Sequence, residues 1–271
     1  MQTSHPLSRV LLTLPALLLA ALVSGAVDDP AGAKTIRLSS TRAFSLAAKL
    51  DMPESRPAYA IRRVTTGPAI VIDGKFDDPA WQGIPAMSDF LVEGKALARN
   101  ATIARLVRDD TYLYLAMDCR QPNIRPVPAQ RAAARDTVAW GGEVVELFLN
   151  VGPQTGMAPQ SRRYVQVIFD TSGAFTDMFD NKPEWNGDIV AATQVLPESG
   201  WRLEARLKIA DLGGGGRGEP FLWSGNVCRS SGGQDSNWAG LVGSHHQPDR
   251  FGLLTLASQV EVTELGLSTL G

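Results

Sequence analysis

The sequence predicts an all-β protein with one antiparallel β-sandwich domain of the immunoglobulin-like or jelly-roll-like kind. Its 17 prolines and 26 glycines lie mostly between short apolar runs, which is typical of a sheet protein with many turns. Several of these runs alternate apolar and polar residues with the period of two that a strand requires. No long helical pattern separates them, which favours strands that pair antiparallel in two packed layers.

The clearest predicted strand covers residues 201–209. Its odd-numbered positions are apolar and its even-numbered positions are charged, so one face should enter the core and the other should face solvent. Further strands are expected at 69–72, 102–108, 112–119, 144–150, 163–169, 190–196, 222–229 and 251–256. Asp109-Asp110 and the turn at 170–173 are typical of hairpin connections.

Two of the predicted strands place polar side chains on a face opposite the core. In 144–150 the leucine stripe belongs inside, so Glu146 should project from the other face. The same parity in 163–169 turns Gln166 outward. If the two strands are neighbours, Glu146 and Gln166 share a surface, where a carboxylate and an amide can meet sugar hydroxyls.

The N-terminal region predicts export and a simple domain order. His5 and Arg9 precede an apolar run that ends before Ser24-Gly25-Ala26, and this run is short for a membrane span. We therefore expect a signal peptide at 1–26, a tether at 27–60 with a short helix at 42–50, the sandwich at 61–258 and a tail at 259–271. The mature chain should be secreted or periplasmic, with no membrane span.

The charge pattern argues against nucleic acid as a partner. The chain has 26 basic and 28 acidic residues, for a formal net charge of −2. No cluster of lysine and arginine provides the positive footprint that phosphate backbones require. Nucleic acid is therefore not expected as a partner.

Two of the six tryptophans have surroundings that differ from the rest. Trp201 and Trp223 lie within predicted strands and should belong to the core, and Trp81 should cap one end of the sandwich. Trp140 and Trp238 sit among small or flexible neighbours. A large ring held near the surface suits the apolar face of a pyranose, although a loop ring that covers the core would have the same sequence signature.

Five segments together resemble carbohydrate-binding module family 9. They are the run Ile72-Asp73-Gly74-Lys75-Phe76-Asp77-Asp78-Pro79-Ala80-Trp81, the hairpin 109–115, the strand 143–149, the strand opening Gly200-Trp201-Arg202-Leu203-Glu204-Ala205, and the run 250–256. In order and spacing they cover about residues 60 to 257. The resemblance implies a β-sandwich that binds oligo- or polysaccharide without cleaving it.

In its sugar-binding members, the family clamps a terminal sugar between two tryptophans. The matching positions are Trp140 and Trp238, and Glu146 matches a carboxylate that hydrogen-bonds the sugar. Gln166 stands where an arginine is expected, and Asp235 where an asparagine is expected. We therefore expect a cleft with the two rings as walls, Glu146 and Gln166 as floor, and Asp235 and Arg229 at the rim.

Three alternatives remain open at this point. Acidic residues around Trp185 could supply the acid and nucleophile of a glycoside-processing enzyme, namely Asp177, Asp180, Glu184 and Asp188. Related sandwiches of the DOMON type carry haem, for which Met117, Met178, His245 and His246 are the candidate axial ligands. A surface interaction domain without a small ligand is the third.

The two cysteines and a group of aspartates raise structural questions. Cys119 and Cys228 are the only cysteines of a chain expected to be exported, which predicts a disulfide, with two buried free thiols as the other reading. No cofactor is expected, although Asp73, Asp77 and Asp78 could bind calcium near a chain reversal. The other reading of these aspartates is a turn in which they accept backbone N–H bonds.

Overall fold

A computed structural model describes residues 56–64, 69–122, 124, 135–138, 142–150, 164–212 and 222–256, together with the backbone of two strands nearer the N-terminus. These two strands are β1 (Val23–Asp28) and β2 (Lys34–Leu38), and they pair antiparallel. They belong to a unit formed by residues 1–39 and 261–271, whereas residues 40–260 form the second unit. The helix expected at 42–50 and the tail at 259–271 lie outside the described residues.

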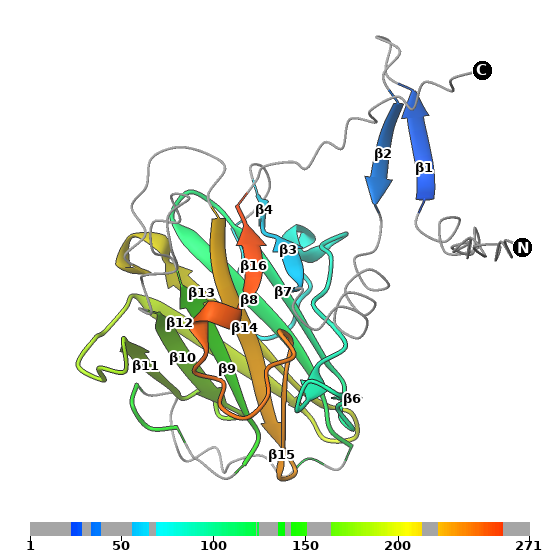
Figure 1. The fold of residues 1–271 in the computed structure, drawn as a ribbon. Helices are drawn as coiled ribbons and strands as arrows, with labels where there is room; N and C mark the ends of the chain where they lie inside the picture. The colour runs from blue at the N-terminus through cyan, green and yellow to red at the C-terminus, as the bar shows by residue number, and fades with distance from the viewer. Residues whose placement is uncertain are drawn as a thin grey trace, which may run out of the picture. The chain divides into compact units, whose positions relative to one another are not determined.

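The second unit contains two β-sheets, as Figure 1 shows. The larger sheet has nine strands, of which β11, β10, β9, β14, β15, β5 and β6 follow one another, while β16 pairs with β14 and β3 pairs with β16. The smaller sheet has the order β12, β13, β8, β7 and β4. Strand pairing is antiparallel except for β3 with β16 and β4 with β7, which confirms the predicted antiparallel β-sandwich.

The strands of the larger sheet are β3 (Ala58–Ala60), β5 (Leu91–Val92), β6 (Ala96–Leu97), β9 (Val144–Asn150), β10 (Val165–Asp170), β11 (Phe175–Phe179), β14 (Leu222–Ser231), β15 (Gln234–Asn237) and β16 (Gly252–Thr255). Those of the smaller sheet are β4 (Arg62–Arg63), β7 (Thr102–Arg108), β8 (Tyr112–Arg120), β12 (Ile189–Leu196) and β13 (Gly200–Lys208). Three short 3-10 helices, η1 (Pro79–Trp81), η2 (Ile209–Leu212) and η3 (Pro248–Arg250), complete the described elements. No described helix is both long and apolar enough to cross a membrane.

The core lies between the sheets and follows the predicted alternation. On β13, Trp201, Leu203, Ala205 and Leu207 are all fully buried in the main cluster. From the other sheet, β9 contributes its leucine stripe with Leu147 at the centre. Burial of each such side chain stabilises the fold by roughly 1.5–3 kcal/mol. The two inner faces therefore contribute most of the hydrophobic stabilisation of the domain.

The predicted strand at 69–72 is wrong, because this segment runs over the outer face of the smaller sheet without joining a ladder. Ile70 and Ile72 pack against a second apolar cluster that includes Tyr114 and Trp81. The Val71 N–H donates to the Asp78 carboxylate at 3.1 Å instead of to a neighbouring strand. Apolar packing explains why the run looked like a strand in the sequence.

Glu204 explains why the run from Ile72 to Trp81 holds its shape. This carboxylate is fully buried and accepts hydrogen bonds from Gly74 N (2.7 Å), Asp73 N (3.1 Å) and the Trp81 indole N–H (2.8 Å). Gly74 has a φ of 82°, and a Cβ there would lie 2.9 Å from the carbonyl carbon of Thr193. Only glycine fits both the left-handed backbone and the close approach.

The domain begins earlier than the predicted boundary at residue 61. Tyr59, inside the predicted tether, is buried, and its hydroxyl donates to Pro85 O (2.8 Å) and accepts from Leu106 N (3.1 Å). Burial raises the pKa of the Tyr59 phenol to about 12. Strand β3 therefore belongs to the larger sheet rather than to a linker.

The predicted disulfide is wrong, because Cys119 and Cys228 are both free and buried. Cys119 lies on β8 and points into the core between the sheets. Cys228 lies on β14 between inward-facing Val227 and Arg229, so it points to the outer face of the other sheet and joins Phe148 and Tyr164. Burial raises the pKa of both thiols, to about 12 for Cys119, which makes both poor nucleophiles.

Candidate functional site

The outer face of the larger sheet is covered by the chain that connects β15 to β16, residues 238–251. An apolar cluster joins this connection to the sheet. Leu241 and Phe251 of the connection pack in it with Phe148, Tyr164 and Cys228. Asn237 holds the start of this connection by accepting from Leu241 N (2.7 Å) and donating to Leu241 O (3.1 Å). Because the carbonyl oxygen and the NH2 group of the Asn237 side chain both bond to Leu241, the connection stays close to the sheet. Its path brings His245 and His246 over β9 and β10.

Glu146 and Gln166 meet on this outer face, because the strands that carry them are neighbours, which is the condition that the sequence left open. Strand β10 pairs with β9, and the Gln166 side-chain amide donates to Glu146 Oε2 at 2.6 Å. The second carboxylate oxygen, Oε1, lies 3.6 Å from His245 Nδ1. The Glu146 side chain is 13% exposed, so it remains accessible at the rim of the covered region.

Gln166 has an unused acceptor in this cluster. The residue is 3% exposed, and its Oε1 receives a hydrogen bond from none of the described residues. The amide orientation is fixed because its NH2 group faces a carboxylate, which can only accept. A buried carbonyl oxygen without a donor costs about 1–3 kcal/mol, so this position favours a hydroxyl or N–H brought by another molecule.

His246 closes one side of the same cluster. The Tyr164 hydroxyl donates to Asn181 Oδ1 (2.9 Å) and lies 2.6 Å from His246 Nδ1. Since its single proton goes to Asn181, the hydroxyl accepts from His246, which assigns the proton to Nδ1. Desolvation raises the pKa of the Tyr164 phenol.

Trp238 does not form the predicted wall of a surface cleft. It is 2% exposed, belongs to the main core and meets Tyr59 edge to face at a centroid distance of 6.5 Å. A Cβ at position 252 would lie 2.3 Å from its ring, so Gly252 provides the space for the indole. An aromatic platform must expose a face to its ligand, and Trp238 exposes none. Trp140 lies outside the described residues.

Arg229 is also buried rather than at a rim. It is fully inaccessible, and its guanidinium donates to Glu143 Oε2 (2.8 Å), Arg120 O (2.9 Å) and Thr102 Oγ1 (3.2 Å). The other Glu143 oxygen accepts from Ser231 Oγ at 2.7 Å. We call Glu143, Arg229, Ser231 and Trp201 the clasp, since the Trp201 indole N–H also donates to Glu143. The clasp joins strands of both sheets. Asp235, in contrast, is exposed and accepts from Ser230 Oγ.

The residues of the enzyme and haem alternatives are dispersed or already engaged. Asp177 is buried in an ion pair with Arg135 and accepts from Gly187 N at 2.9 Å, while Glu184 is exposed. Met117 lies fully buried between the sheets, whereas His246 contacts the opposite face of the larger sheet. Met178, which pairs with Gln166, lies on the same outer face as His246, whereas Met117 is separated from both by the larger sheet.

The three aspartates near the chain reversal make local contacts. Asp73 forms an ion pair with Lys75 at 2.6 Å, and the Lys75 side chain lowers the pKa of this carboxyl. Asp78 accepts from Val71 N. Within the part of the chain that the structure describes, no three His, Cys, Asp or Glu side chains are placed to hold a metal ion. The aspartates that accept backbone N–H bonds act as turn residues.

Sequence reasoning did not place His245 beside Glu146. The two residues are far apart in the chain, and they meet only because the connection from 238 to 251 folds back over the sheet. The adjacent histidines in an otherwise histidine-poor chain were the available signal.

Comparison with solved structures shows a consistent fold. A candidate carbohydrate-binding protein from Bacteroides uniformis is 14% identical, with a TM-score of 0.56 over 75% of this chain and 100% of that chain. A family 9 carbohydrate-binding module from Caldicellulosiruptor kristjanssonii in complex with cellotriose is 16% identical, with a TM-score of 0.52 over 78% and 100%. A family 9 module from the same organism in complex with glucose is 15% identical, with a TM-score of 0.50 over 75% and 97%.

Other comparisons give no match: no family model and no curated protein matches this chain. The structural likeness covers most of the chain and almost the full length of each neighbour. The chain is a β-sandwich with the fold of the family 9 carbohydrate-binding modules.

Proposed function

We propose that this protein binds carbohydrate without cleaving it, at the outer face of the larger sheet around Glu146, Gln166 and His245. The observation that carries the proposal is the unused Gln166 Oε1, buried beside a carboxylate that still has capacity to accept. Sugar hydroxyls both donate and accept, so one hydroxyl can donate to Gln166 while its neighbour donates to Glu146. The structural neighbours solved with cellotriose and glucose support a neutral sugar as ligand.

The clamp expected from the family resemblance is revised in this proposal. Trp140 remains the proposed stacking ring, because it precedes Glu146 by six positions and the strand that follows it, β9, carries the site. Trp238 is buried, and among the described residues His245 is a ring that borders Glu146. Asp235 lies on the same outer face, two strands and two rows of cross-strand pairs from Glu146, and can contact a longer oligosaccharide.

Isothermal titration with cellotriose and glucose tests the proposal. We expect binding by the wild type, loss of binding in Glu146→Ala, and a cost of about 1–3 kcal/mol in Trp140→Ala from the loss of one large apolar contact. Cellotriose should be recovered intact after prolonged incubation. Lys208→Gln, on the outer face of the other sheet, is the control and should bind as the wild type does. Unchanged binding in the Glu146 variant would reject this site.

We also propose that residues 1–26 direct export and are removed. Removal after Ala26 would take away four of the six residues of β1, since that strand begins at Val23. The mature protein would then lack the β1–β2 hairpin while its sandwich stayed whole. N-terminal sequencing of the exported protein should give Val27 as the first residue, and an intact Met1 in the exported fraction would contradict cleavage.

A further inference from the structure

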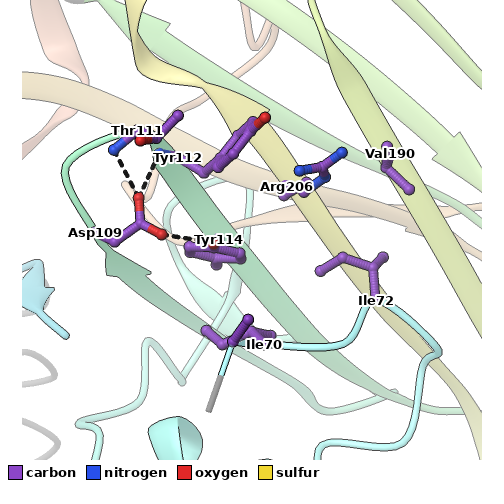
Figure 2. A pocket seen from close by; sticks show the side chains of 9 residues that line it. Ile70, Ile72, Asp109, Thr111, Tyr112, Tyr114, Val190 and Arg206 are labelled. Atoms are coloured by element: carbon purple, nitrogen blue, oxygen red, sulfur yellow. Dashed lines mark hydrogen bonds between the residues drawn. The ribbon is translucent and has the colours of Figure 1, made fainter. Parts of the chain in front are cut away.

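A second concave site lies on the outer face of the smaller sheet, on the other layer of the sandwich from Glu146. The pocket has a volume of about 470 Å³. Its floor is formed by the neighbouring strands β8, β13 and β12, and the segment that includes Ile70 and Ile72 forms a wall. This volume lies within the range of about 300–1,000 Å³ that is usual for small-molecule sites. Figure 2 shows its lining side chains.

Arg206 provides the available charge of the pocket. Its guanidinium lies over the Tyr112 ring, with 4.3 Å from Cζ to the ring centroid, and this stacking fixes the plane of the group. The side chain is half-buried and forms no ion pair with any described residue. Arg202, four positions earlier on the same face, faces Asp118 and donates to Lys75 O instead.

Asp109 lies at the opposite end of the pocket from Arg206 (Figure 2), and its carboxylate already accepts hydrogen bonds from the protein. It accepts hydrogen bonds from Thr111 N, Tyr112 N and the Tyr114 hydroxyl, each at 2.7 Å. Desolvation raises the pKa of this carboxyl, but these hydrogen bonds outweigh it and bring the pKa below its usual value. Asp109 therefore holds the hairpin, while Arg206 keeps its N–H groups for a ligand.

Apolar walls complete the pocket. Ile70 and Ile72 form one side, and Val190 forms the side next to Arg206. Val190 is 39% exposed, which makes it one of four large hydrophobic side chains that stand out at the described surface. A ligand for this pocket must offer an apolar face to Val190 and Ile72 and an anion to Arg206.

We propose that this pocket binds a small carboxylate whose body has an apolar face. The carboxylate would take two parallel N–H bonds from the Arg206 guanidinium, a geometry for which an arginine fork is suited. The body would lie between Ile72 and Val190. The site is separate from the sugar site of the larger sheet and does not depend on it. Two sources share this chemistry, namely an acidic sugar such as a uronate and a non-sugar carboxylic acid.

Titration followed by NMR chemical shifts tests the proposal, with glucuronate and benzoate as probes and with glucose and benzamide as their uncharged counterparts. We expect at least one carboxylate to shift resonances of Val190 and Tyr112 and to bind at least tenfold more tightly than its uncharged counterpart. Binding of glucuronate alone would identify an acidic-sugar site, and binding of benzoate alone a site for non-sugar acids. Equal binding of the charged and uncharged probes, or binding of neither acid, would overturn the proposal.

Arg206→Gln should weaken carboxylate binding at least tenfold. Lys208→Gln is the matched control, because it removes a positive charge from the same face of β13 and is not part of the pocket. It should change affinity less than twofold. An equal loss in the two variants would mean that general surface charge attracts the anion, and would reject the pocket. Thermal unfolding of both variants checks that the fold is intact.

Discussion

The two polar clusters of the larger sheet differ in how completely their carboxylates are satisfied. In the clasp, both Glu143 oxygens accept hydrogen bonds and the opposing Arg229 is fully buried. At the candidate site, Glu146 holds Gln166 with one oxygen, and Gln166 Oε1 receives no donor from the described residues. The clasp is therefore complete as a structural unit, whereas the Glu146 cluster retains bonding capacity for another molecule.

The largest effect should come from breaking the clasp. In Glu143→Gln the Arg229 charge stays buried without its counterion, which should lower the free energy of unfolding by about 3–5 kcal/mol. Urea unfolding followed by tryptophan fluorescence measures this loss. The double change Glu143→Leu with Arg229→Met should recover much of it, because neither charge remains. A loss below about 1 kcal/mol for Glu143→Gln would show that the pair is hydrated.

A smaller effect should come from Trp238, whose ring the structure places in the core. Trp238→Phe should lower the free energy of unfolding by about 2 kcal/mol, at about 0.8 kcal/mol for each CH2-sized group no longer buried. The change should leave sugar affinity unaltered, provided the variant is folded at the titration temperature. A variant with wild-type stability and weakened sugar binding would instead favour the exposed ring that the sequence predicted.

At the Glu146 cluster, a substitution should affect sugar binding more than the free energy of unfolding. Gln166→Leu removes the buried acceptor that has no donor, which is stabilising, and also the hydrogen bond to the partly exposed Glu146, which is destabilising. Because these two effects oppose each other, the net change in the free energy of unfolding should be within about 1 kcal/mol. Sugar binding should nevertheless be lost, because the floor of the site loses its amide. Parallel urea unfolding and cellotriose titration of one sample give both values. A strongly destabilised Gln166→Leu would mean that this cluster is structural, like the clasp.

The reactivity of each thiol reports on one of the two clusters. In the native protein, neither thiol should react measurably. Cys119 lies near Arg229 and Glu143, and Cys228 lies near Glu146. Neither should react with a thiol reagent at pH 8, because burial raises both pKa values, and both should react in urea. At low urea, Cys119→Ser should leave a faster-reacting thiol than Cys228→Ser does. The 238–251 connection covers Cys228 on the outer face through Leu241 and Phe251, whereas Cys119 lies between the two sheets.

Alternation along strands predicted much of the fold and part of the site. It gave the inner faces of β9 and β13 and the shared surface of Glu146 and Gln166. Applied to β14, the same parity would have placed Arg229 inside with Val227 and turned Cys228 away from Cys119, which excludes the disulfide. The prediction for Trp238 failed for another reason. Small neighbours suggested an exposed loop, yet the small residue that matters is Gly252, which leaves room for the indole.

Side-chain partners that are distant in sequence could not be predicted. The counterion of Arg229 is Glu143, 86 positions away, and the anchor of Gly74 is Glu204, 130 positions away. Local pattern contains no information on which carboxylate meets which donor. The same holds for His245, whose approach to Glu146 depends on the path of the 238–251 connection.

The parallel pairing of β3 with β16 has a consequence for the order of assembly. Residues 58–60 register with residues 253–255, so nearly the whole domain must be synthesised before its first strand finds a place. Contacts of such high sequence separation form slowly and late. Until then the Tyr59 and Trp238 rings cannot make their contact. A chain released before residue 253 would leave β3 without its partner strand in the larger sheet. Final closure is therefore a late event that joins the two ends of the domain.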